Sequence, residues 1–337
     1  MTNIPKILVV GVNWLGDACM TMPALQRFRQ QYPDAHLSML VKPSLTALWH
    51  LHPAINEVLT LEPGNAGLWR TAARLRSEEF DTAFLFPNSW RSAIVSFLAG
   101  IPHRIGAGSA ARRLLLTSPV RLSERARTQH QQWEYADILG IPPSGTLPAP
   151  ALSLSGRDNI LPPAPPGTRT IGLIPGAARG ACKQWPESHF LRTALLIRKT
   201  HPHCRFPIFG TAAEAALCQR IADGLSAAAI TLAGRTTLPQ LAATLAACDT
   251  VICNDSGGMH LAAAAGTPVV AVYGLTDPAK TGPLGSAHQC IRSDHPRASR
   301  DIARDDMEAA RVLESIEPGR VAQAAMKNLQ ATTSSSS

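Results

Sequence analysis

An aspartate just after an apolar run is the first residue in this chain that could carry out acid–base chemistry. Asp17 follows Gly16 in the turn that leads from the expected buried strand Ile7–Val10 toward a helix. A carboxylate in such a turn can accept the proton of a hydroxyl group that attacks an electrophile. The same carboxylate could instead cap the helix, which is a common role of aspartate. The local sequence leaves both interpretations open.

The turn from Gly11 to Asp17 does not match a known phosphate fingerprint. It is not G-x-G-x-x-G, and aspartate follows Gly16 where a P-loop has lysine. Because no G-x-G-x-x-G follows the first strand of either half, the sequence disfavours a nicotinamide oxidoreductase.

A second stretch, Asn254–Pro268, predicts a site for an anion between two expected buried strands. Gly257 and Gly258, together with Ser256, begin a short helix, and the uncovered N–H groups and the helix dipole suit a diphosphate. Asp255 could hold a sugar hydroxyl or fix the loop. His260 could contact a phosphate or a sugar hydroxyl, although a lone histidine is more often structural.

Two further loops follow expected strands of the second half. The loop Pro175–Pro186 contains Gly176, Arg179 and Lys183, and the lysine could neutralise a leaving diphosphate with assistance from the arginine, although a loop lysine is usually solvated. Glu214 opens a helix after another strand. It could bind a ribose diol or simply complement the helix dipole.

The elements that must position these residues alternate between apolar runs and helical patterns, which predicts parallel sheets in two doubly wound α/β domains. Ligands of such domains bind at the carboxyl ends of the strands, so we expect the active site in a cleft between the domains. The expected boundaries are 1–165, ending in a proline-rich linker, 166–331, and a disordered tail at 332–337. The expected strands are Ile7–Val10, Leu37–Val41, Val58–Leu61, Thr82–Phe86, Thr170–Ile174, Arg205–Phe209, Ile230–Leu232, Thr250–Cys253 and Pro268–Tyr273, and the last expected helix is about Met307–Leu329.

Composition indicates a globular protein of the reducing cytosol. The chain has 337 residues, of which 45% are hydrophobic, enough for two domains with their own cores. Its seven cysteines are odd in number and form no C-x-x-C pair, which disfavours a disulfide framework or a zinc site. The apolar run near Met1 is too short for a signal peptide, and no run is long enough to span a bilayer.

The formal net charge of +8 indicates anionic partners. The stretch between Trp90 and Gln129 is one-sidedly basic, which suits a phosphorylated or carboxylated substrate, an anionic membrane surface, or an ordinary solvated face. A nucleic acid is not expected, because aromatic residues make up only 5% and do not interleave with the basic ones. The arginines of this stretch are Arg91, Arg104, Arg112, Arg113, Arg121, Arg125 and Arg127, against the single acid Glu124.

Taken together, these motifs resemble the ADP-heptose:lipopolysaccharide heptosyltransferases of glycosyltransferase family 9, and within them the heptosyltransferase II branch. The resemblance covers nearly the whole chain in order. It is carried by Gly16-Asp17, Phe80-Asp81, Pro87–Ala93, Ala99–Gly106, Pro175-Gly176-Ala177, Lys183–Pro186, Phe209-Gly210 and Asn254–His260. Two positions depart from the family pattern, since Ala178 stands where a polar or acidic residue is expected and Gly258 where leucine is common.

The resemblance implies a GT-B fold, in which two Rossmann-like domains face a cleft and the final helix returns to the first domain. It implies an inverting, metal-independent transfer of L-glycero-D-manno-heptose from ADP-heptose to the first heptose of the lipopolysaccharide inner core, without a cofactor. The acceptor would be an anionic lipid-linked saccharide, met by a peripheral enzyme at the cytoplasmic face of the inner membrane. Three alternatives remain. The chain could transfer heptose directly to Kdo, as heptosyltransferase I does, or act on another acceptor as a different family 9 transferase. It could also be a nucleotide-sugar binding protein without catalytic activity.

The resemblance also assigns roles to residues. Asp17 corresponds to the catalytic base, Lys183 to the residue that engages the donor phosphate and sugar, Glu214 to the ribose ligand, and Asp255 to the heptose ligand. The remaining donor residues are Gly176, Arg179, Ser256, Gly257, Gly258 and His260, and the acceptor residues are Asn13, Asn88, Ser89, Arg91 and Arg104.

Overall fold

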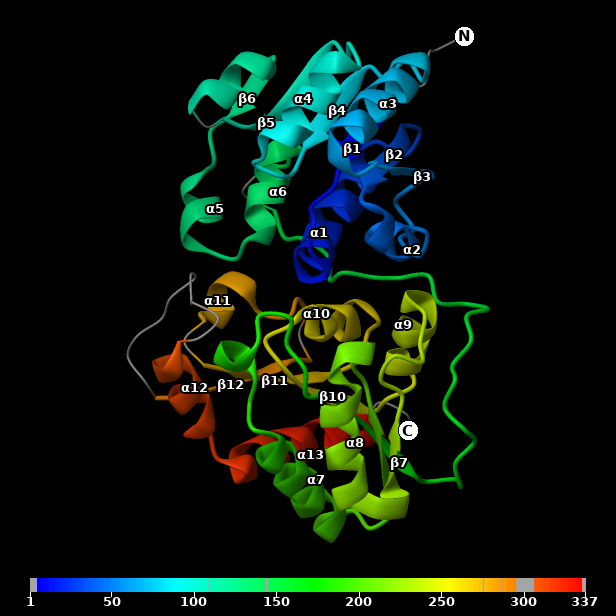
Figure 1. The fold of residues 1–337 in the computed structure, drawn as a ribbon, viewed down its shortest axis with the longest axis vertical. Coiled ribbons are helices and arrows are strands. Elements are labelled where there is room, and N and C mark those ends of the chain that lie inside the picture. Colours follow the sequence, from blue (N-terminus) through cyan, green and yellow to red (C-terminus); the bar gives the residue numbers. More distant parts are fainter. Residues whose placement is uncertain are drawn as a thin grey trace. The chain divides into compact units, whose positions relative to one another are not determined.

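A computed structural model describes residues 5–108, 110–142, 145–274, 276–285, 287–294 and 306–334. The chain divides into two compact units, Met1–Ser153 and Leu154–Ser337 (Figure 1). The boundary between them falls inside the proline-rich stretch from Ile141 to Arg169.

The first unit is built on one parallel six-stranded sheet with the order β3-β2-β1-β4-β5-β6. Its central strand β1 is almost completely buried, as expected for a parallel strand covered on both faces. The strands are β1 (Lys6–Val10), β2 (His36–Val41), β3 (Glu57–Thr60), β4 (Thr82–Leu85), β5 (His103–Ala107) and β6 (Ser118–Val120). The α-helices are α1 (Leu15–Gln31), α2 (Thr46–Trp49), α3 (Gly64–Ser77), α4 (Trp90–Leu98), α5 (Glu124–Thr128) and α6 (Gln132–Ile138).

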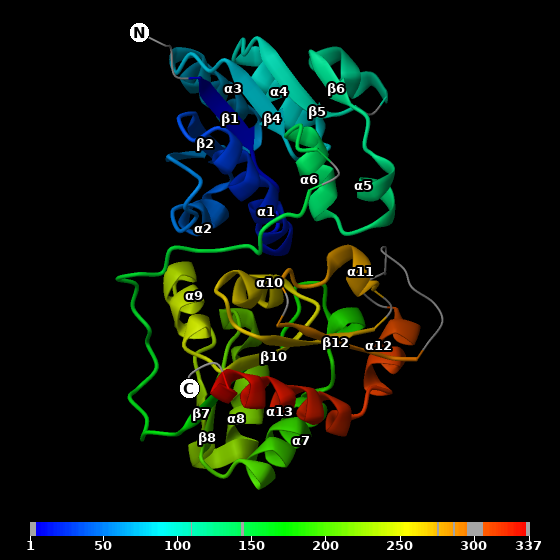
Figure 2. The same ribbon diagram turned by 180° about the vertical axis from the view of Figure 1, so that it is seen from behind.

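Helices pack in pairs on this sheet: α1 lies beside α6, and α3 lies beside α4 (Figures 1 and 2). Strand residues Leu8, Val10 and Leu85 join one apolar cluster with residues of α3 and α4. Because crossovers between parallel strands are right-handed and the chain leaves β1 and β4 toward opposite edges, α1 and α4 cover opposite faces of the sheet.

The second unit repeats this architecture with the strand order β12-β11-β10-β7-β8-β9, again all parallel. The strands are β7 (Arg169–Ile174), β8 (Cys204–Ile208), β9 (Ala229–Thr231), β10 (Thr250–Asn254), β11 (Val269–Tyr273) and β12 (Gln289–Arg292). The α-helices are α7 (Glu187–Thr200), α8 (Ala215–Leu225), α9 (Leu238–Ala246), α10 (Gly257–Ala264), α11 (Pro278–Thr281), α12 (Met307–Glu314) and α13 (Pro318–Ser334).

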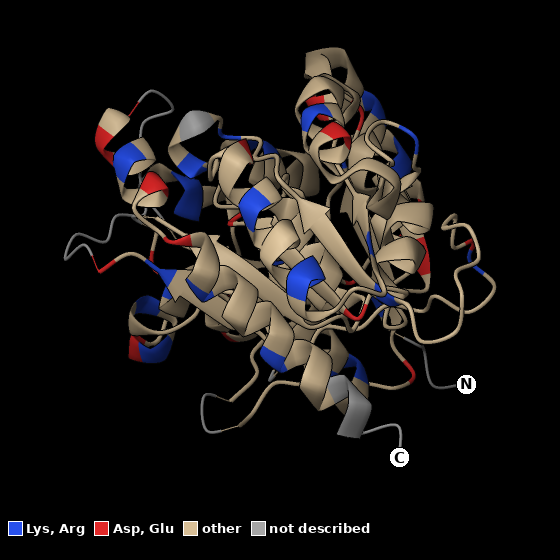
Figure 3. Cartoon of the chain, turned by 90° about the horizontal axis from the view of Figure 1, so that it is seen from below, with Lys and Arg blue, Asp and Glu red and all other residues tan. Residues whose placement is uncertain are grey.

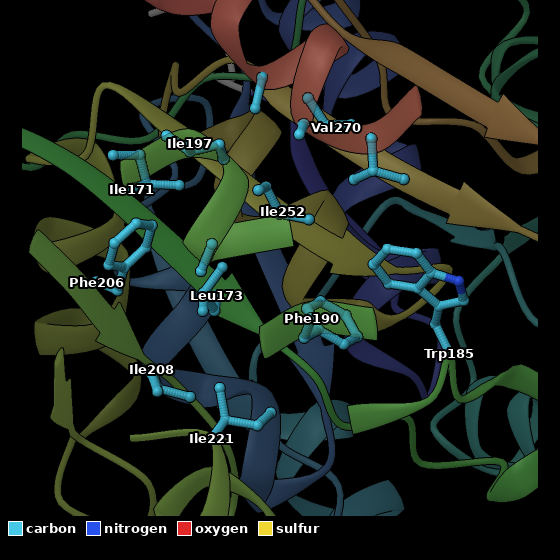
Figure 4. Close-up of a cluster of buried hydrophobic side chains, with 14 of the residues drawn as sticks. Ile171, Leu173, Trp185, Phe190, Ile197, Phe206, Ile208, Ile221, Ile252 and Val270 are labelled. Atoms are coloured by element: carbon cyan, nitrogen blue, oxygen red, sulfur yellow. The ribbon is translucent and has the colours of Figure 1, made fainter. Parts of the chain in front are cut away.

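Trp185 lies in the core of the second unit together with Phe190, Phe206 and Ile252 (Figure 4). Its ring packs edge-on against Phe190, with 5.1 Å between the ring centres. The indole Nε1 donates a hydrogen bond of 3.1 Å to the carbonyl of Ile316, so this tryptophan also fixes the chain just before α13. The loop that follows β7 is therefore anchored to the core at its far end.

The prediction of a single C-terminal helix at about Met307–Leu329 is wrong, because the structure has two helices there. Pro318 has no N–H group to continue the hydrogen-bond ladder, so α12 ends at Glu314 and Pro318 begins α13. Helix α13 packs against α7 and against β10, β11 and β12 of its own unit. It extends through Ser334 of the tail expected at 332–337, and residues 335–337 lie outside the described residues.

Candidate functional site

In the first unit the strand order reverses between β1 and β4. Such a switch point opens a crevice at the carboxyl ends of the two strands, where doubly wound domains bind ligands. Val10 pairs with Leu85, so the two strands end side by side. Asp17 lies beyond β1, and Asn88 and Ser89 lie beyond β4. The sheet therefore brings the predicted base and two predicted acceptor residues to the same edge.

Asp17 is the third residue of α1, and Trp14 occupies the N-cap position with an extended backbone. Asp17 is therefore not the N-cap residue, and its half-buried carboxylate lies in the first turn, where the helix dipole favours a negative charge. Burial raises the pKa of the neighbouring Cys19 thiol to about 12, so this thiol stays neutral. Asn13 is exposed in the preceding loop.

A buried arginine holds the loop after β4. Arg112 is only 1% exposed and donates hydrogen bonds to the carbonyls of Pro87 (2.9 Å) and Ser89 (3.2 Å) and to Oδ1 of Asn88 (3.3 Å). Loss of water around the guanidinium lowers its pKa. The Ser89 hydroxyl accepts a hydrogen bond from the N–H of Ser92 and so caps α4. The predicted acceptor loop is thus fixed from both sides.

Arg91 also lies at the carboxyl edge. Its Nη2 donates hydrogen bonds to the carbonyls of Glu62 (2.6 Å) and Gly64 (2.8 Å), which tie α4 to the loop after β3.

The structure does not bring Arg104 to the edge that carries Asp17. Arg104 is the second residue of β5 and pairs with Ala83 near the start of β4. Its guanidinium donates to the carbonyls of Ile101 and Leu115 and is partly desolvated, which lowers its pKa. This side chain is directed into the fold near the amino ends of the strands.

Several arginines of the basic stretch between Trp90 and Gln129 hold the backbone of the first unit and are not simply solvated. Lys and Arg residues are spread over many helices and loops of the chain (Figure 3). Among the described residues of this stretch, the guanidinium groups of Arg91, Arg104, Arg112 and Arg125 donate to backbone carbonyls.

The second unit has its own switch point between β7 and β10. The loop after β7 carries Gly176, Arg179 and Lys183, and the loop after β10 carries Asp255 and Ser256. Lys183 and Asp255 form an ion pair across this point, with side chains 14% and 10% exposed. Arg179 is exposed. Two donor residues predicted from distant parts of the sequence are thus in direct contact.

Asn254 supports this ion pair and was missed by sequence reasoning. Its Nδ2 donates to the carbonyl of Pro175 (2.7 Å), and its Oδ1 accepts from the N–H of Trp185 (3.0 Å). The completely buried amide therefore holds both ends of the loop that carries Lys183. The sequence does carry a signal for this role, because Asn254 is a polar residue at the end of the apolar run Val251-Ile252-Cys253.

The N-terminus of α10 presents the predicted anion site. Ser256 is its N-cap in extended conformation, and its buried Oγ has no hydrogen-bond partner among the described residues. Gly258 packs tightly, since a β-carbon there would lie 3.0 Å from Cδ1 of Ile174. The N–H groups of this first turn and the helix dipole suit a phosphate. His260 is buried within the helix.

Glu214 ends the short 3-10 helix Ala212–Glu214 and forms a capping box with Thr211. Its Oε2 accepts hydrogen bonds from the N–H (2.7 Å) and the hydroxyl (2.9 Å) of Thr211. Its Oε1 is directed toward Gly176 and accepts no hydrogen bond from the described residues. The carboxylate thus caps this turn through one of its two oxygens.

Within the described residues all seven cysteines are free thiols. In the same part of the chain, no group of three or more His, Cys, Asp and Glu side chains could hold a metal ion. Nor does any helix found there have the length and apolar character needed to cross a membrane.

Comparison with known proteins identifies a family of enzymes that this chain resembles. The model of glycosyltransferase family 9 (heptosyltransferase) matches residues 68–310. Lipopolysaccharide heptosyltransferase 2 of Salmonella typhimurium is 32% identical over 311 residues, which cover 85% of this chain and 88% of that protein. Lipooligosaccharide heptosyltransferase 2 of Haemophilus ducreyi is 31% identical over 312 residues, with the same two coverages of 85% and 88%.

A solved structure resembles the whole chain. The structure of Escherichia coli ADP-heptose LPS heptosyltransferase II matches with a TM-score of 0.82 and 28% identity, covering 97% of this chain and 99% of that one. The predicted α/β class with two Rossmann-like domains of the GT-B type is confirmed by this match and by the two parallel sheets.

Proposed function

Since the chain belongs to glycosyltransferase family 9, the heptosyltransferases, we propose that it transfers L-glycero-D-manno-heptose from ADP-heptose to the first heptose of the lipopolysaccharide inner core. The observation that carries this proposal is the Lys183–Asp255 pair at the switch point of the second unit. The pair joins a cation and a carboxylate next to the N-terminus of α10, and such a helix N-terminus suits a diphosphate.

The reaction is a single displacement with inversion. The carboxylate of Asp17 takes the proton of the acceptor hydroxyl while its oxygen forms a bond to the anomeric carbon of the heptose. The bond from that carbon to the diphosphate oxygen breaks, and ADP leaves with the electron pair. Lys183 and the N–H groups from Ser256 to Met259 neutralise the charge that develops on the diphosphate. With these groups in that role, we expect full activity in excess EDTA.

The donor is bound by the second unit. Oε1 of Glu214 accepts a hydrogen bond from a ribose hydroxyl of ADP, next to Gly176. Asp255 accepts one from a heptose hydroxyl while it remains paired with Lys183. Ser256, Gly257 and Gly258 surround the diphosphate, and Arg179 and His260 complete the proposed donor set.

The acceptor is bound by the first unit at the edge that carries Asp17. Asn13, Asn88 and Ser89 belong to loops at this edge, and Arg91 lies in the first turn of α4. An anionic acceptor suits the net positive charge of the chain. Arg104 is left out of this set because it lies near the amino ends of the strands. A lipid-linked acceptor further implies work at the cytoplasmic face of the inner membrane.

ADP release from ADP-heptose, measured with a panel of truncated lipopolysaccharide acceptors, tests this function. An acceptor ending in one heptose should support turnover, and an acceptor ending in Kdo should not. Turnover on the Kdo acceptor alone would assign the activity of heptosyltransferase I instead. ADP binding without transfer to any member of the panel would favour the non-catalytic alternative.

A further inference from the structure

Two tryptophans at the switch point of the first unit are left in solvent. Trp14 is 62% exposed and Trp90 is 52% exposed. Large aromatic side chains stabilise a fold when they are buried, so exposed rings at a ligand-binding edge indicate a use in binding.

The fold places both tryptophans at the edge of the sheet that carries Asp17. Trp14 is the N-cap of α1, three residues before Asp17, and Trp90 is the first residue of α4, directly after Ser89. The preceding strands β1 and β4 are paired neighbours, which lie about 4.8 Å apart in such sheets. The helices that begin at these two tryptophans, α1 and α4, cover opposite faces of the sheet.

The rings have no evident structural duty. The Trp14 side chain makes no capping hydrogen bond, and neither ring joins an aromatic pair within the described residues. Trp14 does contact a cation, because Nζ of Lys42 lies 5.3 Å from its ring centre. Lys42 directly follows β2, so it belongs to the same carboxyl edge.

We propose that Trp14 and Trp90 bind the acceptor saccharide by stacking against the C–H faces of its sugar rings, with Lys42 contributing a positive charge for an acidic substituent. The inference rests on the proposed function, which places a sugar acceptor at this edge. The electron-rich face of an indole attracts polarised C–H groups as it attracts cations. A flat ring also binds with little loss of conformational entropy, since tryptophan has only two side-chain torsions.

The nucleobase of the donor could also stack on an indole. The groups that suit ADP, however, are Glu214, Lys183 and the N-terminus of α10, all in the second unit. The two tryptophans are therefore expected to affect the acceptor and not ADP, and this difference is measurable.

The test uses the full-length enzyme with a deacylated, water-soluble acceptor that ends in one heptose. We expect Trp14→Ala and Trp90→Ala each to raise the acceptor KM about 3- to 10-fold, the range of one aromatic contact. The KM for ADP-heptose should not change. In Trp14→Phe and Trp90→Phe the acceptor KM should stay close to the wild-type value, because these variants keep an aromatic ring. Trp69→Ala is the matched control, since Trp69 is 61% exposed on α3 of the same unit.

An unchanged acceptor KM in both alanine variants overturns the proposal, and so does an equal increase in the Trp69→Ala control. A raised KM for ADP-heptose instead of the acceptor would assign the rings to the donor and also overturn it. If wild-type enzyme turns over no acceptor, the proposed function fails. Quenching of the Trp14 or Trp90 fluorescence by the acceptor, compared between wild type and the Phe variants, then decides whether this edge binds a saccharide at all.

Discussion

Gly176 and Glu214 approach each other so closely that a β-carbon at position 176 would lie 2.0 Å from Oε1 of the glutamate. The loops after β7 and β8 therefore meet at this point. The carboxylate cannot swing away freely, because its other oxygen is held by Thr211. Glycine at position 176 thus determines where the proposed ribose ligand stands.

Replacing Gly176 by alanine should displace the Glu214 carboxylate. The cost in stability is expected to be about 1 kcal/mol, the worth of one helix cap, while the affinity for ADP should fall about tenfold, the worth of one or two hydrogen bonds. Titration calorimetry with ADP measures the effect. Gly319→Ala in α13 is the control, because a β-carbon there meets nothing within 4 Å. Equal ADP affinity in the two variants would refute the placement of Glu214.

Asp17→Asn should lower kcat by about 10²–10⁴, because the amide cannot accept the proton of the acceptor hydroxyl. The affinity for ADP-heptose should stay at the wild-type value, since the proposed donor-binding groups belong to the other unit. Asp34→Asn, at an exposed carboxylate beyond the other end of α1, should leave kcat unchanged. Near-normal turnover of the Asp17→Asn enzyme would remove this residue from the role of base.

Lys183→Met should weaken both folding and donor binding. It leaves Asp255 largely buried without its cation, which is expected to cost about 1–3 kcal/mol. The double variant Lys183→Met/Asp255→Asn should recover part of that stability without recovering ADP affinity. Denaturant unfolding and ADP titration on the same samples separate the two effects. Wild-type ADP affinity in the single variant would show that the pair is only structural.

The sequence predicts the central strands because they are continuous apolar runs, which any parallel strand buried on both faces requires. It did not predict β5, β6 and β12, which lie toward or at the edges of their sheets. These strands are short and carry polar residues or proline, as in the sequence of β6, Ser118-Pro119-Val120, and their exposure removes the apolar signal.

In the candidate site, too, the sequence predicts some features and the fold alone reveals others. Lys183 and Asp255 stand in motifs that could be recognised, but their ion pair joins positions 72 residues apart and emerges only from the strand order. The local sequence does not predict that Arg112 is buried, because nothing near it in the chain distinguishes it from Arg113. Its role depends on carbonyls more than 20 residues away, which only the folded loop brings together.

Arg112→Lys should loosen the loop that carries Asn88 and Ser89. An ammonium group cannot reproduce the fork that reaches several acceptors at once, so about 1–3 kcal/mol of stability should be lost. The acceptor KM should rise while the KM for ADP-heptose stays constant. Arg113→Lys, at the exposed neighbour, is the matched control. A parallel change in both KM values would contradict a role confined to the acceptor loop.

His52 should make the first unit sensitive to acid. It is buried against Trp49, its Nδ1 accepts from the N–H of Ala54 (3.4 Å), and its Nε2 has no partner among the described residues. Burial lowers its pKa from 6.5 to about 3. Above pH 6.5 the ring is neutral in both states and contributes no pH dependence.

Below pH 6.5 His52 becomes protonated in the unfolded chain but stays neutral in the native protein. The free energy of unfolding therefore falls as the pH decreases toward the native pKa of about 3. At about 1.4 kcal/mol per pH unit, this group should remove about 2 kcal/mol between pH 7 and pH 5. Urea unfolding at the two pH values should show that loss in wild type and in His50→Asn, where the histidine is exposed. His52→Asn, which keeps an acceptor for Ala54, should lack it. The same pH dependence in all three proteins would show that His52 is not the group responsible.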